Sequence, residues 1–239
     1  MSSTRNAENY TSNWETPMWC VRRLIEAVNL PPGWWLEPGA GNGRIIRAME
    51  EDRPGAYNFI AVELRNECKP HLSTLSSVKQ LYCGEDFLQW NARDAWAKIK
   101  GGHAEPHGSF FTGAILNPAF PITLQTLQKC LTICSEVHLL QRLNWLGGGE
   151  NDGKNEFLNN FHPDVRVLPN RVQFLLNGEF PRYPPGSVDG KGRSIAGHKM
   201  PGDSIEYAWY SWGQKPNRFK DYGEIRTLGV TSLEERLAG

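Results

Sequence analysis

The chain has 239 residues, of which 39% are hydrophobic and 22% charged, and its acidic and basic residues are equal in number. This composition is typical of a globular protein with one large domain, and it excludes a strongly basic, histone-like nucleic-acid binder. No apolar run approaches the ~20 residues that a membrane-spanning helix needs, and the polar start lacks the apolar core of a signal peptide. We therefore expect no membrane partner.

The first helix is predicted to start at Thr16-Pro17, because a hydroxyl can cap a helix and proline suits its first turn. Apolar residues then recur at helical spacing, at Met18, Val21, Leu24, Ile25 and Val28. The Pro31-Pro32-Gly33 sequence is expected to end this helix.

Strand-like and helix-like segments alternate along the next part of the chain. Strands are expected at 34–36, 58–63, 78–82, 110–116 and 137–143, and helices at 44–51, from 64 to about 75, at 92–99 and at 123–134. This alternation predicts an α/β fold with a parallel sheet. Further strands are expected at 165–168, 172–176 and 205–212, with polar segments at 147–160 and 177–203. In the last strand, alternate aromatic residues are expected to face the core.

A glycine-rich loop, Glu37-Pro38-Gly39-Ala-Gly41-Asn-Gly43, directly follows the strand at 34–36. Parallel sheets place ligands at the carboxyl ends of their strands. The three glycines let the backbone turn sharply and approach a ligand without a Cβ clash, and the following helix presents free N–H groups. The loop predicts a cofactor site. The alternatives are an ordinary turn and an NAD loop, although the third glycine of G-x-G-x-x-G is missing.

Three acidic residues follow the first three strands. Glu37 suits a ligand with a positive or amino-bearing part, such as S-adenosylmethionine (SAM). Glu63 ends the strand after the glycine loop, where an acid can accept hydrogen bonds from ribose hydroxyls. Asp86 is a candidate for holding the adenine amine, and capping a helix is its other interpretation.

The second motif is Asn117-Pro118-Ala119-Phe120, at the end of the fourth strand. An exocyclic amine on an aromatic ring is a poor nucleophile because its lone pair is delocalised. Two acceptors, the Asn117 amide oxygen and the Pro118 carbonyl, would favour a pyramidal nitrogen and stabilise its developing charge. Phe120 supplies a face for stacking a base. The alternative is a simple turn, since Asn-Pro is common in turns.

With these motifs in this order, the chain resembles class I SAM-dependent amino-methyltransferases, and in particular small phage-type or γ-type DNA adenine N6-methyltransferases. The resemblance covers residues 10–215. It implies a Rossmann-like fold, with a mostly parallel seven-stranded sheet flanked by helices and a C-terminal antiparallel strand pair. It also implies that Thr16 and Pro17 help to hold SAM, with a helix cap as the other role of Thr16. The resemblance also implies a cytoplasmic location, in a bacterium or a phage-infected host cell.

The chain departs from the family motif at Ala119, where a second proline is expected, so the turn is predicted to be less rigid. One methyltransferase domain is expected over 1–239, with variable substrate-side segments at 146–160 and 177–204. Candidate substrate contacts in and before the second segment are Arg142, Arg182, Lys191, Arg193 and Lys199. The four cations of the second segment either contact phosphates or lie on a solvated surface, whereas Arg142 either acts near the site or pairs with an acid.

Together these features predict methyl transfer from SAM to the exocyclic amine of adenine in DNA. The target base would have to be flipped out of the duplex or presented on a single strand. Alternatives are RNA bases, the amine of cytosine, protein glutamine, or a SAM-binding subunit without catalysis. No metal is expected, because the five cysteines and six histidines are scattered and no C-x-x-C is present.

Overall fold

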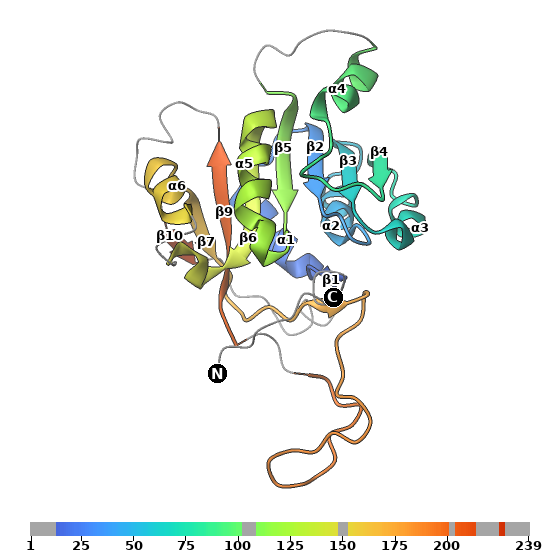
Figure 1. Cartoon of the computed structure of the whole chain (residues 1–239), viewed down its shortest axis with the longest axis vertical. Helices are drawn as coiled ribbons and strands as arrows, with labels where there is room; N and C mark the ends of the chain where they lie inside the picture. The colour runs from blue at the N-terminus through green and yellow to red at the C-terminus, as the bar shows by residue number, and fades with distance from the viewer. Residues whose placement is uncertain (1–12, 102–108, 148–152, 201–203, 214–224, 228–239) are drawn as a thin grey trace.

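The computed structural model describes residues 13–101, 109–147, 153–200, 204–213 and 225–227. The polar start of the chain up to residue 12 and parts of the polar segments expected at 147–160 and 177–203 lie outside these ranges. The described chain is built on one eight-stranded sheet in the order β10-β7-β9-β6-β5-β2-β3-β4 (Figure 1). No helix among these residues is long and apolar enough to span a bilayer.

The strands of this sheet are β2 (Gly33–Pro38), β3 (Tyr57–Glu63), β4 (Val78–Cys83), β5 (Phe111–Leu116), β6 (Cys134–Arg142), β7 (Asp164–Val167), β9 (Tyr207–Gly213) and β10 (Ile225–Thr227). The helices are α1 (Met18–Ala27), α2 (Arg44–Asp52), α3 (Lys69–Leu72), α4 (Ala92–Lys100), α5 (Thr123–Ile133) and α6 (Lys154–Asn160). Short 3-10 turns precede α3 and α5 and follow β6.

Strand directions confirm the predicted fold class. Strands β6, β5, β2, β3 and β4 run parallel to one another, whereas β9 is antiparallel to both of its neighbours, β6 and β7. The short β10 adds an eighth strand, parallel to β7, beyond the seven that were expected. The carboxyl ends of the five parallel strands therefore meet at one edge of the sheet.

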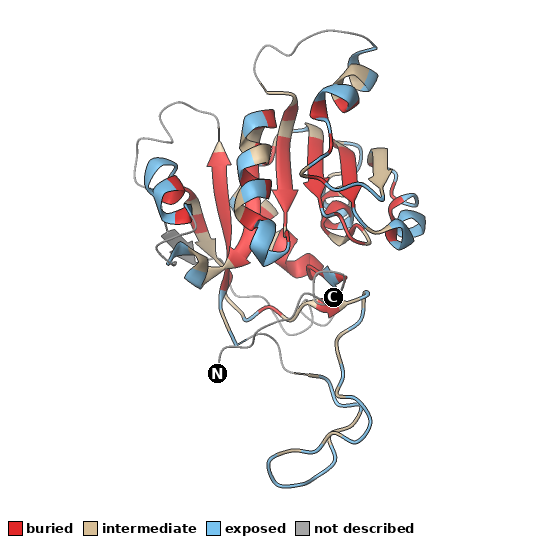
Figure 2. Cartoon of the chain, viewed as in Figure 1, coloured by how far each residue is buried: buried red, intermediate tan, exposed pale blue. Residues whose placement is uncertain are grey.

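Two hydrophobic cores pack against the sheet, and most of its strands are buried (Figure 2). One contains buried side chains of α1, α2 and α3, and the other contains those of α4, α5 and α6. The helices expected at 44–51, 92–99 and 123–134 are confirmed within a few residues, whereas the one expected from 64 to about 75 is shorter, with a 3-10 turn at Asn66–Cys68 followed by α3. The result is a three-layer α/β/α arrangement.

Burial of β9 on both faces differs from the expected alternation. Tyr207 and Trp209 join one core, whereas Tyr210 and Trp212 join the other, and all four are at most 2% exposed. The Trp209 indole donates a hydrogen bond to the Cys20 carbonyl in α1 at 2.8 Å. Helices cover both sides of this strand, so the prediction that only alternate aromatics face a core was wrong.

Other local predictions also needed correction. The segment at 154–160 is helix α6 rather than an irregular polar stretch, and only Leu175–Leu176 of the expected strand at 172–176 is a strand, β8. Helix α1 begins at Met18 with Pro17 as its N-cap residue, and no side chain caps it. The helix-cap role for Thr16 was therefore wrong, because its hydroxyl has a different partner.

A second, two-stranded sheet joins distant parts of the chain at the carboxyl edge. Strand β1 (Trp14–Glu15) pairs antiparallel with β8 (Leu175–Leu176). Residues 177–200, which we call the arm, leave β8 and project from the body of the protein (Figure 1). Isolated bridges join Arg182 with Lys199 and Val188 with Ser194, so the arm is a long hairpin-like ribbon.

The close pairing of β2 with β5 provides a test of the fold. A Cβ on Gly113 would lie 2.7 Å from two ring atoms of Trp35. The Trp35 ring is fully buried, donates to the Pro31 carbonyl at 3.0 Å and packs against Tyr57 and His138. We expect Gly113→Ala to lower the free energy of unfolding by about 1–3 kcal/mol in urea titrations, because the ring cannot yield without strain.

The matched control is Gly190→Ala in the arm, where no atom lies within 4 Å of the added Cβ. This change should stay within about 0.5 kcal/mol of wild type. Equal stability of the two variants would contradict the packing described for Trp35.

Candidate functional site

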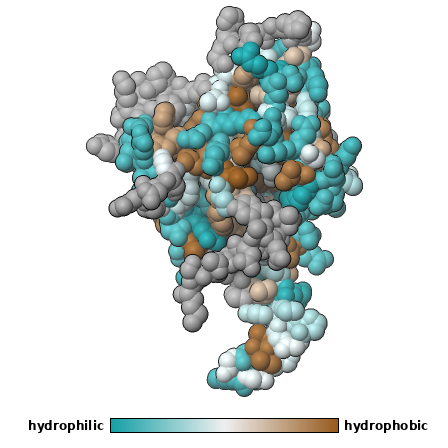
Figure 3. All heavy atoms as spheres, viewed as in Figure 1, coloured by the Kyte–Doolittle hydropathy of each residue, from teal (hydrophilic) through white to brown (hydrophobic). Residues whose placement is uncertain are grey.

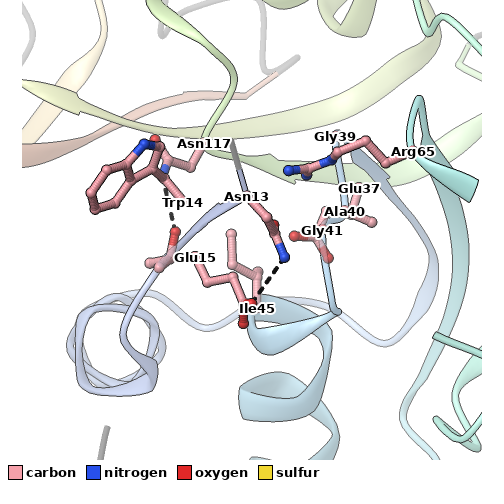
Figure 4. A pocket seen from close by; sticks show the side chains of 11 residues that line it. Asn13, Trp14, Glu15, Glu37, Gly39, Ala40, Gly41, Ile45, Arg65 and Asn117 are labelled. Atoms are coloured by element: carbon pink, nitrogen blue, oxygen red, sulfur yellow. Dashed lines mark hydrogen bonds between the residues drawn. The ribbon is translucent and has the colours of Figure 1, made fainter. Parts of the chain in front are cut away.

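A narrow pocket lies at the carboxyl edge of the sheet, where β2, β5 and β1 meet (Figure 4). Pairing of Trp35 with Gly113 and of Leu36 with Ala114 brings the loop after β2 beside the turn after β5. The pocket is lined by Asn13, Trp14, Glu15, Thr16, Glu37, Gly39, Ala40, Gly41, Ile45, Arg65 and Asn117. The two predicted motifs, 78 residues apart between Gly39 and Asn117, therefore border one cavity.

The glycine loop takes the left-handed conformations that its sequence predicts. Gly39, Gly41 and Gly43 have φ angles of 70°, 54° and 80°. No atom lies within 4 Å of a Cβ built on Gly39, so this residue leaves open space at the pocket. A Cβ on Gly43 would instead lie 2.5 Å from Leu75 Cδ1. Gly43 thus serves helix packing and does not line the pocket, and neither does Pro38, the last residue of β2.

Glu37 is a buried acid at the base of the loop. It is 2% exposed, and its Oε2 has no hydrogen-bond partner among the described residues. Burial raises the pKa of this carboxyl well above its ordinary value of 4.5, and the nearby carboxylate of Glu63 raises it further. An unpaired buried acceptor is costly, so this atom is suited to a ligand that brings a donor or a positive charge.

Glu63 lies behind the loop and already has partners in the protein. Its Oε2 accepts from the Gly41 N–H at 2.7 Å, and its Oε1 accepts from the backbone and Nε of Arg65 at 3.0 and 2.8 Å. The Arg65 side chain itself lines the pocket, and its Nη1 is buried without a partner in the described structure. The ribose-binding acid expected from sequence is thus paired with a cation that sequence reasoning missed.

The pocket wall formed by β1 was also missed. Glu15 is 5% exposed and accepts from the side-chain amides of Asn13 and Asn42 at 3.0 and 2.7 Å, and Arg44 Nε lies 4.0 Å from its Oε2. Figure 4 shows the Asn13 amide directed to Glu15 by its hydrogen bond and the Arg65 side chain reaching into the pocket from the other side. The polar Asn13-Trp-Glu15 sequence offered no signal beyond its place just before the Thr-Pro segment.

Asn117 and Thr16 are joined across the pocket. The Asn117 Nδ2 donates to the Thr16 hydroxyl at 3.1 Å, and Thr16 is 3% exposed. With its amide nitrogen bound in this way, the Asn117 Oδ1 remains available as an acceptor. The side chain that was predicted to cap a helix or hold a cofactor therefore orients the amide of the second motif. The adjacent Pro17 does not line the pocket.

Aromatic faces flank this site. Phe120 and Trp14 are each 39% exposed, and the Arg142 guanidinium lies over the Phe120 ring at 4.2 Å from its centroid. Arg142 Nε also donates to the Tyr207 hydroxyl at 3.1 Å. Arg142 thus lies close to the second motif, and Pro118 in that motif is buried.

The remaining predicted residues lie apart from the pocket. Asp86 is exposed in a neighbouring hollow formed by residues 82–98, and its Oδ1 accepts from the Leu88 N–H at 2.9 Å. In this structure it caps a turn, and the following helix α4 is capped by Asn91 instead, so the alternative of a helix cap at Asp86 was wrong. The cations of the arm are exposed: Arg182, Lys191, Arg193 and Lys199.

The sequence matches no protein-family model and no curated protein. Several solved structures share the fold, and two of them are methyltransferases or candidate methyltransferases that align over most of this chain. A candidate RNA methyltransferase from Pyrococcus horikoshii is 13% identical with a TM-score of 0.52, over 89% of this chain and 93% of that one. The methyltransferase subunit of a type I restriction-modification system from Streptococcus thermophilus is 11% identical with a TM-score of 0.53, over 85% of this chain and 45% of that one. The chain therefore has the Rossmann-like fold found in these methyltransferases.

The buried Glu37 carboxyl predicts a specific pH dependence of stability. The folded chain keeps this proton to higher pH than the unfolded chain does, so stability is lost as the pH rises above 4.5. Glu37→Gln removes the ionisable group. We expect this variant to exceed wild type by at least about 1 kcal/mol near pH 8, with the difference shrinking toward pH 5.

Urea unfolding at several pH values measures this difference. Glu156→Gln, at an exposed carboxyl in α6, is the matched control and should leave the pH dependence of the free energy of unfolding unchanged. If the free energies of unfolding of wild type and Glu37→Gln changed in parallel with pH, Glu37 would be ionised in the folded chain and the prediction would be wrong.

Proposed function

We propose that the chain is a SAM-dependent methyltransferase that acts on the exocyclic amine of adenine in DNA. One observation carries this proposal: Asn117 and the glycine loop line the same pocket, at the carboxyl ends of adjacent strands β5 and β2. A donor held by the loop would then lie next to a planar amine held by the turn. Proximity and orientation supply much of the rate in such a transfer.

The residues present fit SAM as the cofactor. Its bound form would supply an electrophilic methyl group on a sulfonium. The unpaired Glu37 Oε2 offers an acceptor for its amino group, Gly39 leaves room for close approach, and Glu63 keeps acceptor capacity for hydroxyls. Asn13 and Arg65 narrow the pocket, so these two side chains would have to move when a nucleoside-sized ligand binds.

In the proposed reaction, the chain's own groups act on the acceptor amine. The Asn117 Oδ1 and the Pro118 carbonyl accept hydrogen bonds from its two N–H groups, which turns the lone pair out of the ring and stabilises the developing positive charge. The methylated nitrogen then loses one proton to water, so no strong general base is needed. Thr16 holds the Asn117 amide in the orientation that this requires. Phe120 and Trp14 offer partly exposed aromatic faces for a flipped base.

The arm supports a nucleic-acid substrate. It leaves β8, whose partner β1 lines the pocket, and it carries four exposed cations. Asp189 accepts from the backbone N–H groups of Lys191 and Arg193 and pairs with the Arg193 guanidinium at 2.7 Å, which stiffens the tip. Figure 3 shows hydrophobic atoms among the polar ones on the arm, and Val188 is 59% exposed there. We infer that the arm contacts phosphates beside the pocket.

An RNA base is the second candidate acceptor, because the Pyrococcus horikoshii protein with the same fold is described as a candidate RNA methyltransferase. The likeness extends to the fold alone at 13% identity. Cytosine and protein glutamine present the same kind of planar amine or amide and are further outcomes of the test below.

The first test is incubation with SAM and unmodified DNA or RNA, followed by nucleoside mass spectrometry. We expect N6-methyladenine from DNA, and Asn117→Ala should lower its rate by at least about a hundredfold because the acceptor for the amine is lost. Calorimetry should show retained SAM binding in this variant. Asn159→Ala, at an exposed position in α6, is the control. Undiminished transfer by Asn117→Ala would refute the catalytic assignment, and a different methylated product would reassign the substrate.

A second test addresses the arm. We expect Lys191→Glu to weaken DNA binding and to reduce the slope of log Kd against log salt by about one, because a phosphate contact is lost. Lys100→Glu makes the same charge change at the end of α4, at the opposite edge of the sheet, and should leave binding unchanged (Figure 1). Equal effects of the two variants in fluorescence anisotropy would exclude a specific role for the arm.

A further inference from the structure

The turn after β5 is held by a chain of buried polar side chains that the proposed function does not use. Thr123 and Gln141 are each 1% exposed, although a polar group in a core is costly unless it is hydrogen-bonded. The Gln141 Nε2 donates to the Thr123 hydroxyl at 3.1 Å, and this hydroxyl donates to the Ala119 carbonyl at 3.2 Å. Both buried groups are thus satisfied through the backbone of the second motif.

The hydrogen bonds of Gln141, at the end of β6, determine which groups donate and which accept in this series. The Gln141 Oε1 accepts from the Arg142 N–H at 2.9 Å, which leaves its amide nitrogen to face Thr123. A threonine hydroxyl commonly bonds to a carbonyl four residues earlier in a helix. Here the Thr123 hydroxyl oxygen also accepts a hydrogen bond from Gln141, so the hydroxyl proton is directed to the Ala119 carbonyl. Strand β6 therefore contacts the turn in two ways, through the hydrogen bonds from Gln141 to Thr123 to Ala119 and through Arg142 over the Phe120 ring.

These contacts coincide with a proline-like backbone conformation at Ala119. Its φ angle is −58° and its ψ angle is 137°. A proline fixes φ at about −65°, so Ala119 has the backbone of a proline without the ring. Its carbonyl also accepts from the Ile122 N–H at 3.1 Å, and no described residue accepts from its own N–H. The residue that replaces the expected second proline is thus constrained by hydrogen bonds to its carbonyl and not by a ring of its own.

We propose that Thr123 and Gln141 are positioning residues for methyl transfer, which hold Ala119 in the conformation that a proline would impose and so aim the Pro118 carbonyl. The inference rests on the proposed function, because it assigns the carbonyl a role in transfer. It assigns no contact with SAM or substrate to Thr123 or Gln141. Their contribution therefore belongs to the transfer rate and not to cofactor affinity.

A double-mutant cycle between positions 123 and 119 tests this proposal. Thr123→Val removes the hydroxyl at nearly constant shape, and we expect it to lower kcat by about tenfold to a hundredfold, with an unchanged Kd for SAM. Thr123→Ser should keep the rate. In the Ala119→Pro background the same Thr123→Val change should cost much less, because the ring now fixes φ.

Thr126→Val is the matched control, one turn further along α5. The Thr126 side chain is 2% exposed and its hydroxyl has no partner among the described residues, so this variant should keep the rate. If Thr123→Val does not fold, Gln141→Met enters the same cycle, since it keeps the length of the side chain and removes the amide. An equal loss with alanine or proline at position 119, or no loss at all, would overturn the proposal.

Amide hydrogen exchange separates this proposal from the proposed function. The Ile122 N–H bonds to the Ala119 carbonyl, so Thr123→Val should speed its exchange and Ala119→Pro should reverse the change. If the wild type transfers no methyl group to any acceptor, the proposed function fails. Unchanged exchange in Thr123→Val would then overturn the positioning proposal on its own.

Discussion

The pairing of β2 with β5 determines where the rest of the candidate site lies. The two strands are consecutive neighbours in the sheet but are separated in sequence by β3 and β4. Gly113 makes the pairing possible because the Trp35 ring occupies the space of its missing side chain. With Leu36 level with Ala114, the two strands end together. A slip in this register would separate Glu37 from Asn117, since consecutive residues of a strand point to opposite faces.

The N-terminal segment completes the site from the other direction. Strand β1 closes one wall of the pocket, and the Thr16–Asn117 hydrogen bond joins residues 101 positions apart. Because β1 also pairs with β8, the base of the arm is attached to the pocket wall. Asn13 belongs to both regions, since it lines the pocket and its backbone carbonyl accepts from the Asn177 N–H at the base of the arm at 3.0 Å.

The sequence predicted the alternating core well, because each of its elements carries a local signal. Strands β2, β3 and β5 are short apolar runs, and the loop after β2 has glycines where left-handed φ angles occur. Features that depend on distant partners were not predictable. The two residues of β1 have no strand pattern, and they pair with β8 only because the fold brings them together. The Thr16 hydroxyl had a plausible local role as a cap, but its partner is 101 positions away in Asn117. Double-sided burial of β9 depends likewise on α1 and α6, which lie far from it in sequence.

Charge in the pocket distinguishes between the two cofactor classes that the glycine loop admits. A dinucleotide loop presents free N–H groups and a helix N-terminus to a pyrophosphate. Here the Gly41 N–H is already bonded to Glu63, and the buried Glu37 carboxyl lies at the base of the loop. Glu15 and Glu63 have cationic neighbours in Arg44 and Arg65, whereas Glu37 Oε2 has no partner among the described residues. An anion placed against this loop would raise the pKa of the Glu37 carboxyl further. A ligand with an ammonium or sulfonium group would instead supply the missing counter-charge and stabilise the ionised carboxylate, which favours SAM over NAD.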